Sequence, residues 1–268
     1  MCNWYIYSLL TGVVLALLYI GLVRLKHFVL YVPHRLTEAE ARPPPASTVS
    51  TFVRTSDDRD MLSAVQSTNG VRVIFSHGNY GNLTDYYPLF GHIDKLLMWD
   101  FRGYGRSTGE PHEKCNALDL MAIVDATGLS EDDLVLIGHS LGTNVTMRYL
   151  DYAMRHKKTV PQTVILINPF FRLSDVVGHH FNCLAWIAHL TGNMDVTETV
   201  QQYLDYNDQN ELYILYTTHD RVTPSAPVLE AVRNLERVTV IDVGGEHHSI
   251  LQNDKIFKEV KNILSSSY

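Results

Sequence analysis

The segment 138–142, Gly-His-Ser-Leu-Gly, has the residue types and spacing of a serine nucleophile held on a sharp turn. Apolar residues 134–137 precede it with the length of a buried strand, and residues 143–155 can follow it as a helix. Where a strand turns directly into a helix, the backbone segments come so close that glycine is required on both sides of the turn. The segment therefore predicts an exposed, nucleophilic Ser140 at the carboxyl end of a sheet, where open α/β sheets bind their ligands.

A serine hydroxyl is a weak nucleophile at neutral pH, so it needs a base to take its proton and an acid to orient that base. Asp220 lies in a loop directly after the apolar segment 211–217, which is an expected strand. Asp220 alternatively caps the helix that we expect to begin near Pro224, but Thr223 is better placed for that role. We therefore predict that Asp220 is the acid.

The base is expected after the next strand, at residues 238–243. A Gly-Gly-Glu turn there leads to two adjacent histidines, His247 and His248. An imidazole can accept and return a proton near neutral pH, so either histidine suits the role of base. We predict His247 and keep His248 as the alternative.

Developing oxyanion charge in acyl transfer needs backbone N–H donors, one from the residue after the nucleophile and one from an upstream loop. The loop 77–81, His-Gly-Asn-Tyr-Gly, follows the expected strand 71–76 and has glycines that let the backbone approach a substrate. The predicted donors are the N–H groups of Leu141 and Asn79, with Tyr80 as the alternative to Asn79.

The elements that must position these residues alternate along the chain. Strands are expected at 49–54, 61–66, 71–76, 96–101, 134–138, 163–168, 211–217 and 238–243, and helices at 83–92, 113–127, 143–155, 225–235 and 255–264. Such alternation predicts an α/β fold with a mostly parallel sheet and helices on both faces. The first two strands are expected to form an antiparallel hairpin at the sheet edge, and residues 169–208, where the alternation stops, a small cap.

The N-terminal segment has the length and composition of a membrane anchor. Residues 4–23 are 20 consecutive uncharged residues, enough for a helix to cross a bilayer core of roughly 30 Å. We expect one transmembrane helix within an anchor 1–35, in preference to a cleaved signal peptide or a buried helix. Basic residues follow the span and none precedes it, which favours the cytosolic side for the rest of the chain. A proline-rich linker, 36–48, is expected to lead to a domain at 49–268.

Composition excludes several other classes of protein. The net charge of −7 and the pI near 6.0 argue against a nucleic-acid partner. Three cysteines without a C-x-x-C pair indicate free thiols, not a disulfide framework or a zinc site. No metal-ligand spacing or dinucleotide-binding pattern is present, so no cofactor is expected.

The combined motifs resemble those of α/β-hydrolase-fold serine hydrolases. They are the loop beginning His77-Gly78-Asn79, the segment 100–109, the turn around Ser140 and the Asp-x-Val-x-Pro loop. More narrowly, residues 50–265 are similar to the membrane-associated branch with monoacylglycerol and lysophospholipid lipases and protein depalmitoylases. The chain departs from that branch in its second histidine, His248, and in the segment after residue 168.

The resemblance implies the α/β-hydrolase fold and, by matching position, Ser140 as nucleophile, Asp220 as acid and His247 as base. It implies cleavage of carboxylic esters or thioesters through an acyl-enzyme. With the anchor, it makes the bilayer a partner, lipids or acylated proteins the expected substrates, and the endoplasmic reticulum or another endomembrane the expected location. A serine peptidase and a non-catalytic binding protein on the same fold are the alternatives.

Overall fold

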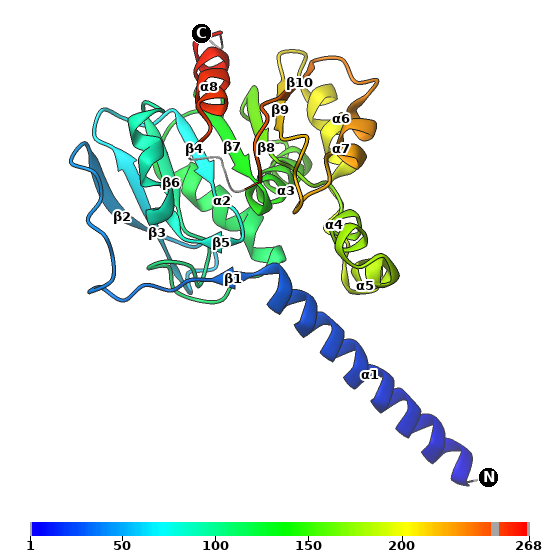
Figure 1. Ribbon diagram of the computed structural model, residues 1–268. Helices are drawn as coiled ribbons and strands as arrows, with labels where there is room; N and C mark the ends of the chain where they lie inside the picture. Colours follow the sequence, from blue (N-terminus) through cyan, green and yellow to red (C-terminus); the bar gives the residue numbers. More distant parts are fainter. Residues whose placement is uncertain (1, 248–251, 267–268) are drawn as a thin grey trace.

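The structure, a computed structural model, describes residues 2–247 and 252–266, with side chains from Tyr7 onward (Figure 1). Eight strands form one sheet in the order β10-β9-β8-β7-β4-β6-β3-β2, and β1 pairs with β5 in a separate ladder. The strands are β1 (Val32–Pro33), β2 (Thr48–Arg54), β3 (Met61–Ser67), β4 (Val73–Ser76), β5 (Tyr80–Gly81), β6 (Leu96–Trp99), β7 (Val135–His139), β8 (Thr163–Ile167), β9 (Glu211–Tyr216) and β10 (Val238–Asp242). The six strands from β10 to β6 are parallel, and β3 and β2 form the antiparallel edge that the sequence predicts.

The helices follow the expected alternation. They are α1 (Cys2–Leu30), α2 (Glu113–Thr127), α3 (Leu141–Arg155), α4 (Leu173–His180), α5 (Ala185–Thr191), α6 (Thr197–Tyr206), α7 (Ser225–Val232) and α8 (Asp254–Ser266), with 3₁₀ helices η1 (Leu83–Gly91), η2 (Glu131–Asp133) and η3 (Asn182–Leu184). The expected α/β architecture with a mostly parallel sheet is therefore confirmed.

Two apolar cores, one on each face, hold the layers together. Strands β4, β6, β7 and β8 are buried along their whole length, as apolar strands covered on both faces must be. One core packs α2, α3, α6 and α7 against the sheet, and the other packs η1 and α8 against the opposite face. The sheet is thereby fixed from both sides, and the carboxyl ends of its parallel strands lie at one edge.

The helix expected at residues 83–92 is present, and a proline sets its type. It forms the 3₁₀ helix η1, with Pro88 inside it and Asn82 and Asp85 in a capping box at its start. Pro88 has no N–H to donate and its ring obstructs a regular α-helix, so the tighter form is the physical outcome.

Residues 169–208, the predicted cap, contain α4, η3, α5 and α6. Helices α4 and α5 pack against each other, and α5 also contacts α1. Helix α6 packs on α3, within the main core. The segment therefore divides into a helical pair beside α1 and a helix that belongs to the core layer.

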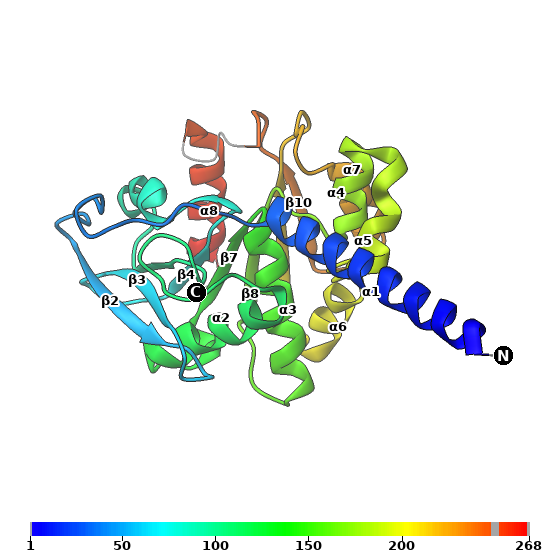
Figure 2. The same ribbon diagram turned by 90° about the horizontal axis from the view of Figure 1, so that it is seen from below.

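Helix α1 extends from the sheet-bearing part as a long rod (Figures 1 and 2). Its residues Tyr7–Leu30 are long and apolar enough to cross a membrane. After it, β1 pairs with β5, and Leu36 donates its N–H to the carbonyl of Gly105 at 2.8 Å. The chain just after α1 is thus hydrogen-bonded to the sheet-bearing part well before residue 49, and the predicted division into anchor, linker and domain stays a prediction.

Candidate active site

Ser140 lies on a strained turn between β7 and α3. Its φ of 52° and ψ of −115° place a non-glycine residue in a conformation that L-amino acids rarely adopt. A Cβ on Gly138 would lie 2.6 Å from the carbonyl oxygen of Gly142, and a Cβ on Gly142 would lie 2.0 Å from the carbonyl oxygen of Ser76. Both glycines are therefore required by close backbone contacts, which is the steric reason the sequence predicts.

The structure brings the side chains of Ser140, His247 and Asp220 together. Nε2 of His247 lies 2.9 Å from Oγ of Ser140, and Nδ1 of His247 lies 2.6 Å from Oδ2 of Asp220. All three side chains are largely removed from solvent, the imidazole with only 4% of its surface exposed. His248, the alternative base, lies outside the described residues.

Asp220 is held as an acceptor of several hydrogen bonds. Its Oδ1 accepts from the N–H groups of Val222 and Thr223, at 2.7 and 2.8 Å. Burial opposes ionisation of Asp220, but the hydrogen bond and charge of His247 and these N–H groups outweigh it and lower the pKa of the carboxyl. An ionised Asp220 keeps the proton of His247 on Nδ1 and leaves Nε2 to face the serine.

Thr223 is a site residue that sequence reasoning placed elsewhere. Its hydroxyl lies 2.8 Å from Oδ2 of Asp220 and 3.2 Å from Nδ1 of His247. The sequence predicts Thr223 as the cap of the next helix, but the N-cap of α7 is Pro224, without a side-chain cap. The Asp-x-x-Thr spacing could have indicated this contact, because a turn beginning at Asp220 brings Thr223 back to the Asp220 carboxylate.

The loop 77–81 lies against the start of α3, as the close approach of Gly142 to Ser76 shows. The side chain of Asn79 donates to the carbonyl of Leu30 at 3.3 Å, while its backbone carbonyl accepts from the hydroxyl of Tyr104 at 2.9 Å. Tyr80 belongs to β5 and has an exposed side chain. The N–H groups of Asn79 and Leu141 have no acceptor among the described residues, so both are available to an oxyanion.

A buried histidine and a buried aspartate lie next to the loop 77–81. Nδ1 of His77 lies 2.6 Å from the carbonyl of Gly78, and its Nε2 faces Oδ1 of Asp100 at 3.6 Å. Burial lowers the pKa of His77 to about 4 and raises the pKa of Asp100 to about 7. His77 is therefore neutral, and its Nδ1–H fixes the backbone next to Asn79.

Arg102 anchors the turn that follows Asp100. Its guanidinium forms a two-point contact with Asp119, at 2.7 and 2.9 Å, and also reaches Asp57 and Asp60. Arg102 therefore has a structural role, because it joins three carboxylates around the turn. The side chain of Asp100 faces His77 and not Arg102. The backbone carbonyl of Asp100 accepts a hydrogen bond from the hydroxyl of Ser107 at 2.8 Å.

Among residues 2–247 and 252–266, no three His, Cys, Asp or Glu side chains are grouped so that they could hold a metal ion. Free thiols are described at Cys115 and Cys183. The expectation that no cofactor is needed stays a prediction.

The chain matches the model of the alpha/beta hydrolase family over residues 73–259. With this match and a sheet of the corresponding topology, the chain belongs to the alpha/beta hydrolase family.

Individual curated proteins match the chain at low identity in the two examples that follow. The chain is 22% identical over 231 residues to the uncharacterized protein R595 of Acanthamoeba polyphaga mimivirus, covering 76% of this chain and 78% of that protein. It is 29% identical over 131 residues to the lysophosphatidylserine lipase ABHD12 of Xenopus tropicalis, covering 46% of this chain and 34% of the lipase. The match therefore spans about a third of that lipase.

Solved structures share the fold. The esterase Pf2001 of Pyrococcus furiosus superposes with a TM-score of 0.67 at 17% identity, over 88% of this chain and 98% of the esterase. An alpha-beta hydrolase from Vibrio vulnificus superposes with a TM-score of 0.66 at 17% identity, over 83% and 82% of the two chains.

Proposed function

We propose that this protein is a membrane-anchored serine hydrolase that cleaves carboxylic esters or thioesters of lipids or acylated proteins through an acyl-enzyme. The observation that carries the proposal is the contact of Ser140 Oγ with His247 Nε2 at 2.9 Å, with Asp220 2.6 Å from the other ring nitrogen. A nucleophile, a base and an orienting acid in this order define acyl transfer chemistry.

In the proposed reaction, Oγ of Ser140 attacks the substrate carbonyl carbon while Nε2 of His247 takes the hydroxyl proton. Asp220 stabilises the resulting imidazolium, and Thr223 holds the Asp220 carboxylate in place. The N–H groups of Asn79 and Leu141 stabilise the tetrahedral oxyanion. Collapse breaks the bond to the leaving alcohol or thiol, which takes the proton from His247. Water then attacks the acyl-enzyme with His247 again as base, releasing the acid and free Ser140.

Two observations favour lipid or lipid-linked substrates. Helix α1 is apolar and its residues 7–21 are exposed, so it suits a single-pass anchor that keeps the hydrolase at a membrane surface. Relatives in the family include lysophosphatidylserine lipases, and the fold is shared with esterases. A cytosolic orientation on the endoplasmic reticulum or another endomembrane is part of the proposal.

Fluorophosphonate labelling of the full chain tests the nucleophile. The wild type is expected to react, Ser140→Ala to lose the label, and Ser174→Ala, a buried serine outside the site, to keep it. Labelling that survives in Ser140→Ala would overturn the proposal.

Hydrolysis assays on the same proteins then test the substrate class. Lysophospholipid, monoacylglycerol, acyl-thioester and peptide substrates are compared in lipid nanodiscs. Turnover of an ester or thioester that depends on Ser140 supports the proposal. Turnover of peptides alone would identify a serine peptidase. Labelling of Ser140 without turnover of any substrate would identify a binding protein.

A further inference from the structure

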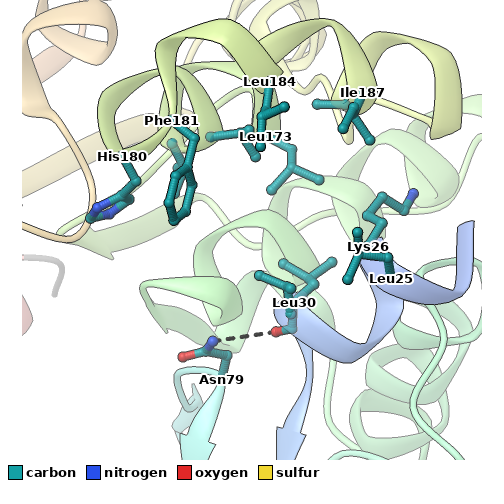
Figure 3. A pocket seen from close by; sticks show the side chains of 13 residues that line it. Leu25, Lys26, Leu30, Asn79, Leu173, His180, Phe181, Leu184 and Ile187 are labelled. Atoms are coloured by element: carbon teal, nitrogen blue, oxygen red, sulfur yellow. Dashed lines mark hydrogen bonds between the residues drawn. The ribbon is translucent and has the colours of Figure 1, made fainter. Parts of the chain in front are cut away.

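An apolar cavity of about 240 Å³ lies between α1 and the helices α4 and α5 (Figure 3). Leu25, Val29 and Leu30 of α1 form one wall, and residues of α4, η3 and α5, such as Leu184 and Ile187, form the other. Asn79 lines the same cavity, and its backbone N–H is one of the two proposed oxyanion donors. The cavity thus connects the anchor helix to the loop next to the candidate nucleophile.

The chemistry of the lining selects a hydrocarbon chain. Nearly all of its surface is aliphatic or aromatic, and the polar groups at its edge already have partners. The ammonium of Lys26 binds Glu113 at 3.0 Å and the carbonyl of Thr191 at 2.7 Å, and the ring of His180 lies 3.0 Å from the carbonyl of Val222. No charge is left to attract a head group, so an apolar chain is the ligand that fits.

The wall that α1 contributes is fixed in place. Lys26 joins α1 to the last turn of α5 and to the first turn of α2. His27 contacts the carbonyl of Pro111 at 2.5 Å, and the buried Tyr31 accepts a hydrogen bond from Asn116 at 3.1 Å. The carbonyl of Leu30 accepts from the Asn79 side chain, the contact drawn in Figure 3. The last turns of α1 are therefore part of the hydrolase body, so they can shape a binding site.

The cavity lies where membrane lipid can enter it. Residues 4–23 are enough to cross a bilayer core of roughly 30 Å, which leaves Leu25 to Leu30 at the membrane surface. The adjacent helical pair exposes large apolar side chains, Phe181, Trp186 and Leu190, of the kind that sit at a membrane interface. The cavity therefore lies at the level of the membrane surface, beside exposed apolar side chains.

We propose that this cavity holds the acyl chain of the substrate, so that the membrane helix is itself a wall of the substrate site and the chain enters sideways from the bilayer. The volume suits one chain, since sites for larger, drug-sized ligands span about 300–1,000 Å³. The inference rests on the proposed function for the identity of the substrate, and it adds that Leu25, Val29 and Leu30 determine acyl-chain length.

Cavity-filling variants of the full chain, in phosphatidylcholine nanodiscs, test the inference. Val29→Trp fills the cavity from α1 and Leu184→Trp from the opposite wall, while Val14→Trp makes the same change in α1 outside the cavity. The readout is the ratio of kcat/KM for p-nitrophenyl palmitate to that for p-nitrophenyl butyrate. We expect the ratio to fall about tenfold or more in the two filling variants, because methylene groups lose their buried contacts, and to stay within about twofold of wild type in Val14→Trp. An unchanged ratio in Val29→Trp and Leu184→Trp would overturn the inference.

A second measurement does not depend on catalysis. A diazirine-bearing palmitic acid is photo-crosslinked to the Ser140→Ala chain, and the modified peptides are mapped by mass spectrometry. The expected labels fall on residues 25–30 and 184–188, are displaced by palmitate, and disappear when Val29→Trp is added. If this labelling occurs but the wild type shows no ester hydrolysis that depends on Ser140, the proposed function is rejected and the cavity remains a binding site for an acyl chain. Labelling that palmitate does not displace, or that Val29→Trp leaves intact, would reject the cavity.

Discussion

Oγ of Ser140 and Nε2 of His247 lie 2.9 Å apart although 107 residues separate them in the sequence. Neighbouring parallel strands explain this contact. Strands β7, β8, β9 and β10 follow one another across the sheet, and each ends at the same edge. Ser140 follows β7, Asp220 lies in the loop after β9 and His247 in the loop after β10. After β8, Asn168 donates to the carbonyl of His247 at 3.3 Å and thereby holds the histidine loop.

Removing the carboxylate of Asp220 is expected to cost far more activity than removing its supporting hydroxyl. Asp220→Asn should lower kcat by about 10⁴-fold, because the amide no longer holds His247 in the required tautomer. Thr223→Val keeps the shape of the side chain and removes one hydrogen bond to Asp220, so kcat should fall by about tenfold. Steady-state kinetics with one ester substrate measure both. Equal losses in the two variants would show that Thr223 does more than position the carboxylate.

Gly142, two residues after the proposed nucleophile Ser140, is expected to tolerate no side chain. In Gly142→Ala the new Cβ would meet the backbone of Ser76 and His77, so the strand and helix must separate. We expect a loss of about 1–3 kcal/mol or more in unfolding free energy, and loss of fluorophosphonate labelling. Gly91→Ala is the matched control, because its Cβ would meet nothing within 4 Å, and it should keep both properties. Normal labelling in Gly142→Ala would contradict the proposed close packing.

Much of the fold follows from local patterns. Continuous apolar runs such as 135–139 become buried parallel strands, because a sheet covered on both faces needs no polar side. The turn at Ser140 was predictable because close backbone contacts require glycine at positions 138 and 142, and the sequence shows both as the pattern G-x-S-x-G. A helix was predicted at the position of η1, and its 3₁₀ form follows from Pro88 inside it.

The parts that could not be predicted depend on contacts between distant residues. Lys26 binds the carbonyl of Thr191 across 165 residues, and no local pattern indicates that a lysine after an apolar span ends in a protein contact. Thr223 was assigned to a helix cap because capping is the commoner use of a threonine there. The His77–Asp100 pair was missed because burial of a charged residue depends on the assembled core.

The His77–Asp100 pair predicts opposite pH effects from its two members. His77 has a folded pKa of about 4 against an ordinary 6.5, so the unfolded chain binds a proton first and stability falls as the pH drops from 6.5 to 4. Asp100 has a folded pKa of about 7 against an ordinary 3.8, so the folded chain binds a proton first and stability rises as the pH drops from 7 to 3.8. In the wild type the two effects oppose each other between pH 4 and 6.5.

Each single variant leaves the other effect unopposed. Asp100→Asn should lose stability relative to wild type as the pH falls from 6.5 to 4.5, and His77→Phe should gain stability relative to wild type over the same range. Each slope is at most about 1.4 kcal/mol per pH unit. Thermal unfolding of the three proteins at pH 4.5, 5.5, 6.5 and 7.5 measures the difference. Curves that run parallel in all three would show that neither group titrates as described.

The ammonium of Lys26 is expected to hold α1 to the rest of the protein. Its side chain is 10% exposed and contacts Glu113, which is 21% exposed, together with two carbonyls. Lys26→Met should lower the unfolding free energy of the full chain in detergent by about 1–3 kcal/mol, because it leaves Glu113 half-buried without its cation. Adding Glu113→Gln should restore part of this loss, since the uncompensated charge is then removed.

Arg24 is the matched control, because it is exposed on the same helix and has no described partner. Arg24→Met should change stability by less than about 0.5 kcal/mol. If Lys26→Met and Arg24→Met melt at the same temperature, the contact does not fix α1, and the wall of the acyl cavity is free to move.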